Sequence, residues 1–250
     1  MSAATARFTL SPNICSTSDE DGSTILDIQH DKIYSVVGVS SLIWQKLADS
    51  GSGLAMHSII DDLSNRFQDV SRRTIEADVS KLLESFRSKG MIVAEGKANR
   101  LRSSFSQPIT RTINALGRVF TSLLFRMRLY TFTAFLGIAS VNLVLRLLRF
   151  QTLCEAVKQW PINDRAVIPD AREQVCEAVK KAASWYPRQS MCLQRSAVTT
   201  CLLRQSGVAA DLVIGCRKIP FGAHAWVEVC GEVANDKRQV QTFYKVLTRL

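Results

Sequence analysis

The sequence predicts an α+β protein with two folded domains that are joined by a basic helical segment. Three observations lead to this fold class. Within the first 97 residues, two strand-like runs are followed by three helical stripes. Residues 98–152 carry many arginines and no acidic side chain, and residues 153–250 alternate between helical and strand-like runs. With 250 residues, 46% of them hydrophobic, the chain is long enough for two cores.

The first 97 residues have the pattern of a small winged-helix-like domain. Thr24–Ile28 and Lys32–Val37 are rich in β-branched residues and flank a turn-prone segment, which predicts a hairpin. Three runs with apolar residues at spacings of three and four then predict helices. These runs are Leu42–Leu47, Met56–Phe67 and Ile75–Phe86. Gly90 is expected to end the third helix, and residues 91–94 are expected to form a closing strand.

The middle segment, residues 98–152, contains eight arginines and an uncharged apolar stretch from Leu129 to Leu145. As a helix this stretch is about 25 Å long, just short of a bilayer core. Three interpretations stay open: a helix packed on the C-terminal domain or on a partner protein, a basic amphipathic helix on a lipid surface, and a transmembrane span.

The last segment, residues 153–250, is the candidate catalytic domain. A helix is expected near residues 170–185, and a second from Cys192 to Gln205. Strands are expected at 211–215 and 224–229, and a third closes at Asp236. Cys192 therefore begins a helix, His224 begins a strand, and Asp236 ends a strand.

A thiol, an imidazole and a carboxylate are the parts of a nucleophilic cysteine site. The first turn of a helix favours the thiolate of Cys192, His224 can act as its acid–base partner, and Asp236 can orient the imidazole. With a two-residue loop at 230–231, His224 lies opposite Lys237 and Asp236 points to the other face. We therefore expect a three-residue loop or a bulge between Val229 and Asp236.

The composition argues against several other functions. Seven cysteines without a Cys-x-x-Cys pair favour a reducing cytoplasm, and three scattered histidines argue against a zinc site. The net charge of +10 combines −3 in residues 1–97 with +13 in residues 98–250. Because the winged-helix-like part is the acidic part, nucleic acid is not an expected partner. The sequence has no phosphate-binding glycine loop, so we expect no bound cofactor. The first ten residues have no apolar run of secretory length, so we expect a cytoplasmic location, with contact to a membrane surface left open.

The run Tyr34–Leu47, with its Gly-containing turn and Ile-Trp pair, and the later Gly90–Val93 resemble the PqqD family of peptide-recognition domains. The resemblance covers about residues 8–95. It implies that a leader peptide adds as a strand to the hairpin edge and packs against the third helix. The residues it points to are Lys32, Ile33, Tyr34, Ser35, Val36, Leu82 and Phe86.

Residues of about 150–247 resemble the transglutaminase-like cysteine peptidases that remove leader peptides in lasso-peptide biosynthesis. The matching motifs are Cys192-Leu193-x-Arg195, the run from Ala210 to Phe221, His224–Val229 and Asn235-Asp236. The resemblance implies a catalytic set of Cys192, His224 and Asp236. It also implies a precursor peptide as substrate and an asparagine-synthetase-like macrolactam ligase as partner, with ATP used by that ligase. Two alternatives are a non-hydrolytic acyl transferase of the same fold and a non-catalytic adaptor that delivers the leader.

Overall fold

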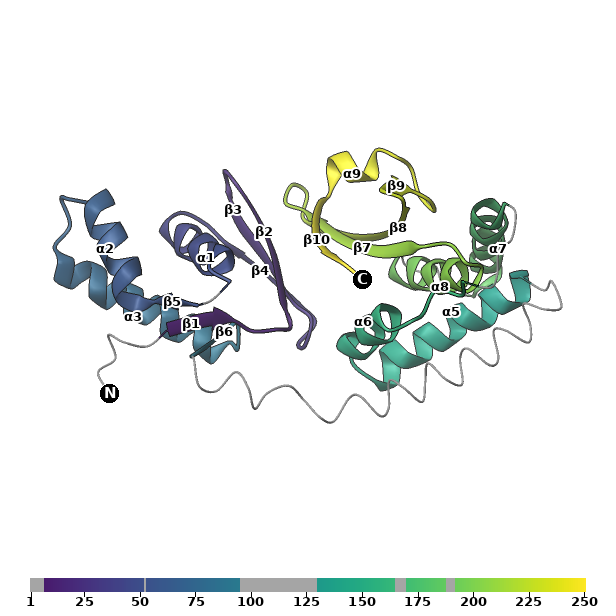
Figure 1. Ribbon diagram of the computed structural model, residues 1–250, viewed down its shortest axis with the longest axis horizontal. Helices are drawn as coiled ribbons and strands as arrows, with labels where there is room; N and C mark the ends of the chain where they lie inside the picture. The colour runs from purple at the N-terminus through teal and green to yellow at the C-terminus, as the bar shows by residue number, and fades with distance from the viewer. Residues whose placement is uncertain (1–6, 52, 95–129, 165–169, 188–191) are drawn as a thin grey trace. The chain divides into compact units, whose positions relative to one another are not determined.

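The computed structural model describes residues 7–51, 53–94, 130–164, 170–187 and 192–250. The chain divides into two compact units, residues 1–104 and 105–250, and each is described here by itself (Figure 1). The boundary that we placed near residue 97 lies outside the described residues, and the one at 152 falls within a helix of the second unit.

The N-terminal unit combines two small sheets with three helices. Its elements in order are β1 (Arg7–Leu10), β2 (Ile14–Asp19), β3 (Gly22–Asp27), β4 (Lys32–Val36), α1 (Val39–Asp49), β5 (Leu54–Ala55), α2 (Met56–Arg66), α3 (Arg72–Ser88) and β6 (Ile92–Ala94). The strands form two antiparallel sheets, β5-β1-β6 and β2-β3-β4. The predicted hairpin is present, with Ile25 opposite Tyr34. The three predicted helices and the closing strand are present as well.

The core of this unit forms where the inner faces of the three helices meet the sheets. Trp44 is fully buried and meets Phe86 edge to face, with ring centroids 5.2 Å apart. Ile43, Leu47, Ile59 and Leu83 are also buried in this cluster. The stripes at spacings of three and four therefore pack as expected.

In its described residues, the C-terminal unit combines five helices with one antiparallel sheet. Its elements are α5 (Tyr130–Leu147), α6 (Phe150–Lys158), α7 (Ala171–Trp185), α8 (Cys192–Gln205), β7 (Ala210–Arg217), β8 (Gly222–Val229), β9 (Glu232–Val233), α9 (Val240–Phe243) and β10 (Lys245–Arg249). The strand order is β10-β7-β8-β9. Side chains of α5, α7 and α8 form one core cluster with Ala210 and Val227 of the sheet. A smaller cluster contains Val213, Trp226, Val233 and Val240.

Helix α5 contains most of the apolar stretch of the middle segment. Ala134 and Ile138 are fully buried against α7 and α8, and an added Cβ at Gly137 would lie 3.0 Å from Val198. Phe132, Leu143 and Leu147 are exposed. Its 18 residues have a mean hydropathy of 1.4, so by length and composition alone this helix could also cross a membrane. The packing of α5 within the second unit corresponds to the first of the three interpretations of the sequence, a helix packed on the C-terminal domain or on a partner protein.

Several elements were not predicted from the sequence. Strands β1, β2, β5 and β10 and the short helices α6 and α9 have no counterpart in the expected order. The strand expected to end at Asp236 is shorter than predicted, because β9 ends at Val233 and the chain bends over the next three residues. This early end decides how the carboxylate reaches His224.

Candidate active site

The structure brings Cys192, His224 and Asp236 together in the C-terminal unit. Cys192 is the first residue of α8, and its thiol forms a hydrogen bond with the imidazole of His224 on β8. Nε2 of His224 lies 2.7 Å from Oδ2 of Asp236. Because Asp236 takes Nε2, Nδ1 is the ring nitrogen left for the thiol. The side chains of His224 and Asp236 are 21% and 26% exposed, so the pair is shielded without being closed off from solvent.

The open edge of β8 holds the thiol and its helix in place. Strand β9 pairs with β8 only at Val229 and Glu228, so the backbone of Ala225 has no strand partner on that side. The N–H of Ala225 instead donates to the Cys192 sulfur, and its carbonyl accepts a 2.9 Å hydrogen bond from Oγ of Ser196. Ser196 lies one turn after Cys192 on α8 and is buried. Cys192 and Ser196, on one face of α8, thus bond to the N–H and the carbonyl of Ala225.

Asn235 completes this edge. Its Oδ1 accepts from the N–H of Val227 at 2.8 Å, and its Nδ2 donates to Oγ of Ser196 at 2.9 Å. The side chain therefore replaces a missing strand and fixes the bend just before Asp236. The backbone N–H of Lys237 donates to Oδ1 of Asp236 at 2.7 Å, which leaves Oδ2 for the imidazole. Sequence reasoning recognised Asn235-Asp236 as a motif but assigned no role to Asn235 or Ser196.

The pKa of the Cys192 thiol is lowered, and that of the His224 imidazole is raised. Burial disfavours the Cys192 thiolate, but hydrogen bonds from His224 and from the N–H groups of Ala225 and Leu193 outweigh it and lower the thiol pKa. The hydrogen bond to Cys192 raises the pKa of His224. Burial opposes this rise, and Asp236 adds to it. Both directions favour a thiolate–imidazolium pair.

Aromatic rings pack around the imidazole. The ring of His224 stacks on Trp226 with centroids 6.3 Å apart and meets Tyr244 at 5.1 Å. Trp226 is fully buried, and its Nε1 donates to Oε1 of the buried Glu228 at 2.8 Å. The close approach of this indole explains Gly215, the β7 residue opposite His224, where a Cβ would lie 2.7 Å from a ring carbon. The imidazole is thus held by packing as well as by hydrogen bonds.

The predicted three-residue loop or bulge is absent, because β8 and β9 are joined by a two-residue turn. Cys230 and Gly231 both have positive φ, 51° and 80°, as this tight turn requires. In unbroken pairing Asp236 would face away from His224. The chain instead leaves the ladder after Val233, and the bend turns the carboxylate toward the imidazole. The expected irregularity is therefore an early strand end.

The other cysteines of the C-terminal unit lack this environment. Cys154 and Cys216 are buried, and burial raises the pKa of Cys201 to about 12. Burial also raises the pKa of Cys176, although Arg172 partly opposes this. Cys230 is exposed on the tight turn. The pKa of Cys192 is thus lowered, whereas those of Cys176 and Cys201 are raised.

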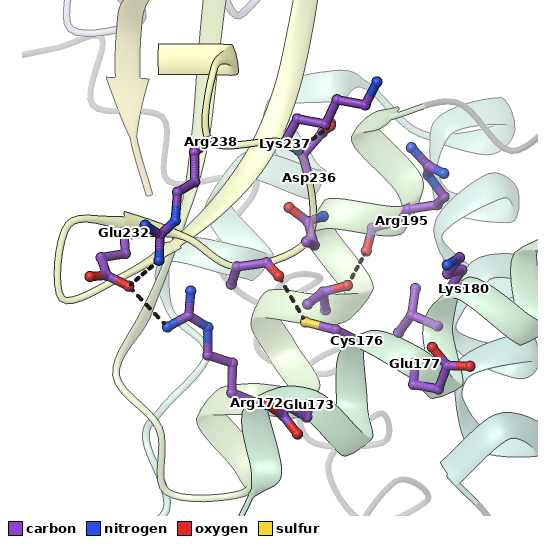
Figure 2. A pocket seen from close by; sticks show the side chains of 14 residues that line it. Arg172, Glu173, Cys176, Glu177, Lys180, Arg195, Glu232, Asp236, Lys237 and Arg238 are labelled. Atoms are coloured by element: carbon purple, nitrogen blue, oxygen red, sulfur yellow. Dashed lines mark hydrogen bonds and ion pairs between the residues drawn. The ribbon is translucent and has the colours of Figure 1, made fainter. Parts of the chain in front are cut away.

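A pocket of about 900 Å³ lies on the Asp236 side of this site (Figure 2). Residues of α7, the first turns of α8 and the segment from Glu232 to Arg238 line it. Cys192 and His224 do not line it, so this pocket flanks the nucleophile and does not contain it. Among the described residues, no group of histidine, cysteine and carboxylate side chains is arranged to hold a metal ion.

The predicted peptide-binding residues lie in the N-terminal unit, mostly at its surface. Lys32, Ile33, Tyr34, Ser35 and Val36 form β4, and among the described strands β4 pairs only with β3. Leu82 lines an apolar groove of about 520 Å³ between α1, α2 and α3. Phe86 is 4% exposed and packs against Trp44, so its side chain belongs to the core and is removed from the candidate surface.

Comparison with known proteins yields a match for each unit. Residues 136–249 match the transglutaminase-like superfamily, and residues 22–92 match coenzyme PQQ synthesis protein D (PqqD). The microcin J25-processing protein McjB of Escherichia coli is 37% identical over 62 residues, which are 25% of this chain. The match spans 30% of the length of that relative.

Two solved structures also match: TbiB1 in complex with the TbiA(beta) leader peptide, and lasso peptide synthetase B1 complexed with the leader peptide. Both are 24% identical, with a TM-score of 0.31. They cover 35% and 34% of this chain and 95% and 96% of their own chains. The two family models show that residues 22–92 are similar to PqqD and residues 136–249 to the transglutaminase-like superfamily, and with the McjB match they confirm the resemblance of the chain to the B proteins of lasso-peptide biosynthesis.

Proposed function

We propose that the chain is a cysteine leader peptidase that binds a ribosomal precursor peptide and cleaves its leader during lasso-peptide maturation. One observation carries the proposal: a thiol at the start of α8 is hydrogen-bonded to an imidazole, which is hydrogen-bonded to a carboxylate. The pKa of the thiol is lowered and that of the imidazole is raised, as nucleophilic cysteine catalysis requires. The similarity to a microcin-processing protein supports the substrate class.

The geometry assigns a step to each group. The thiolate of Cys192 attacks the carbonyl carbon of the scissile peptide bond, and the resulting oxyanion is placed near the free N–H groups at the start of α8. The imidazolium of His224 donates its proton to the leaving amine, which is the new N-terminus of the core peptide. Water, deprotonated by the neutral imidazole, then hydrolyses the thioester and releases the leader as a free carboxylate. Asp236 keeps the ring oriented through both steps.

Leader recognition is assigned to the free edge of β4 and the groove beside it. An added strand can use the unpaired backbone groups of β4 for affinity, and apolar leader side chains can enter the groove for selectivity. Val39 and Val70, which line the groove, are 45% and 42% exposed, so apolar surface is accessible there. The ammonium of Lys89, just after α3, lies 5.6 Å from the ring centre of Tyr34 on β4, so the end of α3 lies beside this strand.

Catalysis is tested with the full chain, its precursor peptide and mass spectrometry of the products. Cys192→Ala should abolish cleavage, while Cys230→Ala, which removes an exposed thiol on the nearby turn, should leave it unchanged. An added amine that caps the leader in place of water would identify the non-hydrolytic acyl transferase instead. Cleavage that persists in Cys192→Ala would refute the catalytic assignment and favour the adaptor.

Leader binding is tested by fluorescence anisotropy with a labelled leader peptide. Leu82→Asp should weaken binding about tenfold or more, because it places a charge in an apolar groove. Ser88→Asp is the matched control, since Ser88 lies on the same helix, is exposed and does not line the groove. Equal affinities of the two variants would contradict the groove as the leader site. Thermal unfolding of Leu82→Asp checks that the unit stays folded.

The remaining parts of the proposal follow from the family resemblance. We propose that the freed core passes to an asparagine-synthetase-like ligase, which consumes ATP to close the macrolactam ring. The chain itself is proposed to bind no cofactor and to act in the cytoplasm, with peripheral membrane contact as the alternative. Co-purification of the ligase with the full chain, with and without the leader peptide, tests the partnership.

A further inference from the structure

The pocket beside Asp236 has a charge pattern that the catalytic assignment does not use. Five basic and four acidic side chains line its volume of about 900 Å³. The basic residues are Arg172, Lys180, Arg195, Lys237 and Arg238, and the acidic residues are Glu173, Glu177, Glu232 and Asp236. Their pairing decides what the pocket can bind.

Most of the acidic side chains are already neutralised. Glu232 lies 3.4 Å from Arg172 and 4.0 Å from Arg238, and Glu177 lies 3.6 Å from Lys181 outside the pocket. Asp236 pairs with His224, whose raised pKa favours the imidazolium. Within the part of the chain that the structure describes, Glu173 is the one lining carboxylate without a cationic partner.

Three of the basic side chains have no acidic partner among the described residues: Lys180, Arg195 and Lys237. In Figure 2 their charged ends lie on one side of the view, and the ion pairs of Glu232 lie on the other. Set against the one free carboxylate of Glu173, they leave the pocket with an excess of positive charge. Such an excess attracts anions, and more strongly in a concave site than on an open surface.

Arg195 indicates where in the pocket an anion would bind. Its Nε is buried and makes no hydrogen bond, although a buried guanidinium N–H without an acceptor is costly. Arg195 follows Cys192 by three residues on α8, so the two Cβ atoms are roughly 5–6 Å apart. An acceptor bound to Arg195 would therefore belong to a molecule that also reaches the thiol.

We propose that this pocket is a substrate subsite that binds a carboxylate of the peptide, with Arg195 and Lys180 as its main contacts. The inference rests on the proposed peptidase function and names a feature of its substrate. A carboxylate is favoured over a neutral group because it carries the opposite charge and can take two guanidinium N–H groups at once. Its source is an acidic side chain or the C-terminus of the peptide.

A first experiment tests the pocket without any peptide. Cys176 lines the pocket, and Cys230 is an exposed thiol elsewhere in the same unit. Alkylation of the full-length Cys192→Ala chain by iodoacetate and by iodoacetamide, which differ as carboxylate and amide, is followed at both thiols by peptide mass spectrometry. The acetate-to-acetamide rate ratio should be higher at Cys176 than at Cys230.

The charge variants give this measurement its control. Lys180→Gln and Arg195→Gln should each lower the ratio at Cys176 by about threefold, because each removes one charge near a bound carboxylate. Lys158→Gln removes the same charge from an exposed residue of α6 that does not line the pocket, and should leave the ratio unchanged. Equal ratios at the two thiols, or equal effects of Lys180→Gln and Lys158→Gln, would overturn the proposal.

A second experiment uses the precursor peptide. Each acidic residue is replaced in turn by its amide, and the C-terminus is amidated in a separate peptide. One of these changes should raise KM about tenfold with little effect on kcat, and the Arg195→Gln chain should no longer distinguish that peptide from the parent. Arg195→Lys, which keeps the charge, should recover part of the lost affinity.

The two experiments separate this proposal from the peptidase function. A chain that cleaves no peptide but shows the charge-dependent ratio at Cys176 keeps the anion site and loses the peptidase. A chain that cleaves its precursor with the same KM for every amide variant keeps the peptidase and loses the subsite. Circular dichroism and thermal unfolding of each charge variant exclude misfolding as the cause of a changed ratio.

Discussion

Asn235→Ala is the most informative single change at this site, because it touches none of the three reacting groups. The side chain of Asn235 accepts from the N–H of Val227 and donates to Oγ of Ser196. Both partners are buried, at 0% and 1% exposure. Alanine removes both hydrogen bonds, while Cys192 and His224 keep their own side chains.

The expected loss of stability follows from those two groups. A buried donor left without an acceptor costs about 1–3 kcal/mol, and the lost bond to Ser196 adds about 1 kcal/mol. We expect the free energy of unfolding of the C-terminal unit to fall by about 3 kcal/mol in total. For a unit of this size, each 1 kcal/mol corresponds to a decrease in Tm of roughly 2–4 °C, so Tm should fall by roughly 6–12 °C.

The functional effect should exceed what stability alone explains. Without Asn235 the bend that carries Asp236 is free to move, and its carboxylate loses its fixed position beside His224. The hydrogen bond that His224 donates to Asp236 is one of the causes that raise the pKa of His224, so that pKa should fall toward its ordinary value. Because a less stable imidazolium stabilises the thiolate less, the pH midpoint of Cys192 alkylation should move up, measured at a temperature where the variant is folded.

The assay combines thermal unfolding with the rate of Cys192 alkylation by iodoacetamide as a function of pH. Asn235→Asp is the control, since it keeps an acceptor for Val227 but cannot donate to Ser196, and it should lie between wild type and Asn235→Ala. If Asn235→Ala lowers Tm by less than about 2 °C and leaves the pH profile in place, the edge of β8 is not held as we describe.

Three further changes test other parts of the unit. Gly215→Ala should destabilise it by about 1–3 kcal/mol in chemical denaturation, because the new Cβ would lie 2.7 Å from a ring carbon of Trp226. Because the pKa of Cys192 is lowered, its thiolate persists at pH values where an ordinary thiol is protonated. Alkylation of Cys192 in the wild-type chain should therefore stay fast at those pH values. In His224→Ala, the pH midpoint of this alkylation should move up toward that of an ordinary thiol. Arg204→Leu should cost about 3 kcal/mol or more, read from thermal unfolding, because the buried guanidinium donates to four backbone carbonyls, at 2.6–3.4 Å, that would lose a partner. An unchanged pH midpoint of alkylation in His224→Ala would count against the contact between His224 and Cys192. Unchanged stability of Gly215→Ala or of Arg204→Leu would count against the contacts described for that residue.

Much of the candidate site follows from local sequence signals. The bounds of α8, from Cys192 to Gln205, agree with the prediction, because an apolar helical run ends before a glycine. His224 lies on the predicted strand for a similar local reason. The fold class and the α1–α3 helices also follow from periodicity. These features depend on neighbours within a few residues, which is the range over which a sequence pattern carries information.

The missing parts depend on contacts between distant residues. Strand β1 is only four residues long and is defined by pairing with β5 and β6, more than 40 residues away in each case. The early end of β9 likewise results from a side chain that competes with the strand for the N–H of Val227. Parity arguments assume that pairing continues, so they predicted a bulge where the strand simply ends. The role of Asn235 has one local signal, an asparagine directly before the aspartate, and asparagine readily bonds to backbone groups.

The position where β9 ends determines whether the site can exist at all. If pairing continued by three more residues, Asp236 would bond to the backbone of Ala225, and neither the Cys192 sulfur nor the hydroxyl of Ser196 could reach that edge. The N-terminal end of α8 would then lose its anchor on β8, and the thiol would lose a donor that lowers its pKa. One strand that ends early thus provides the donor for the thiolate, the anchor for its helix and the bend that aims the carboxylate. A chain in which residues 234–236 were forced to continue the strand should keep its sheet and lose its reactive thiol, which hydrogen exchange at Ala225 together with Cys192 alkylation would detect.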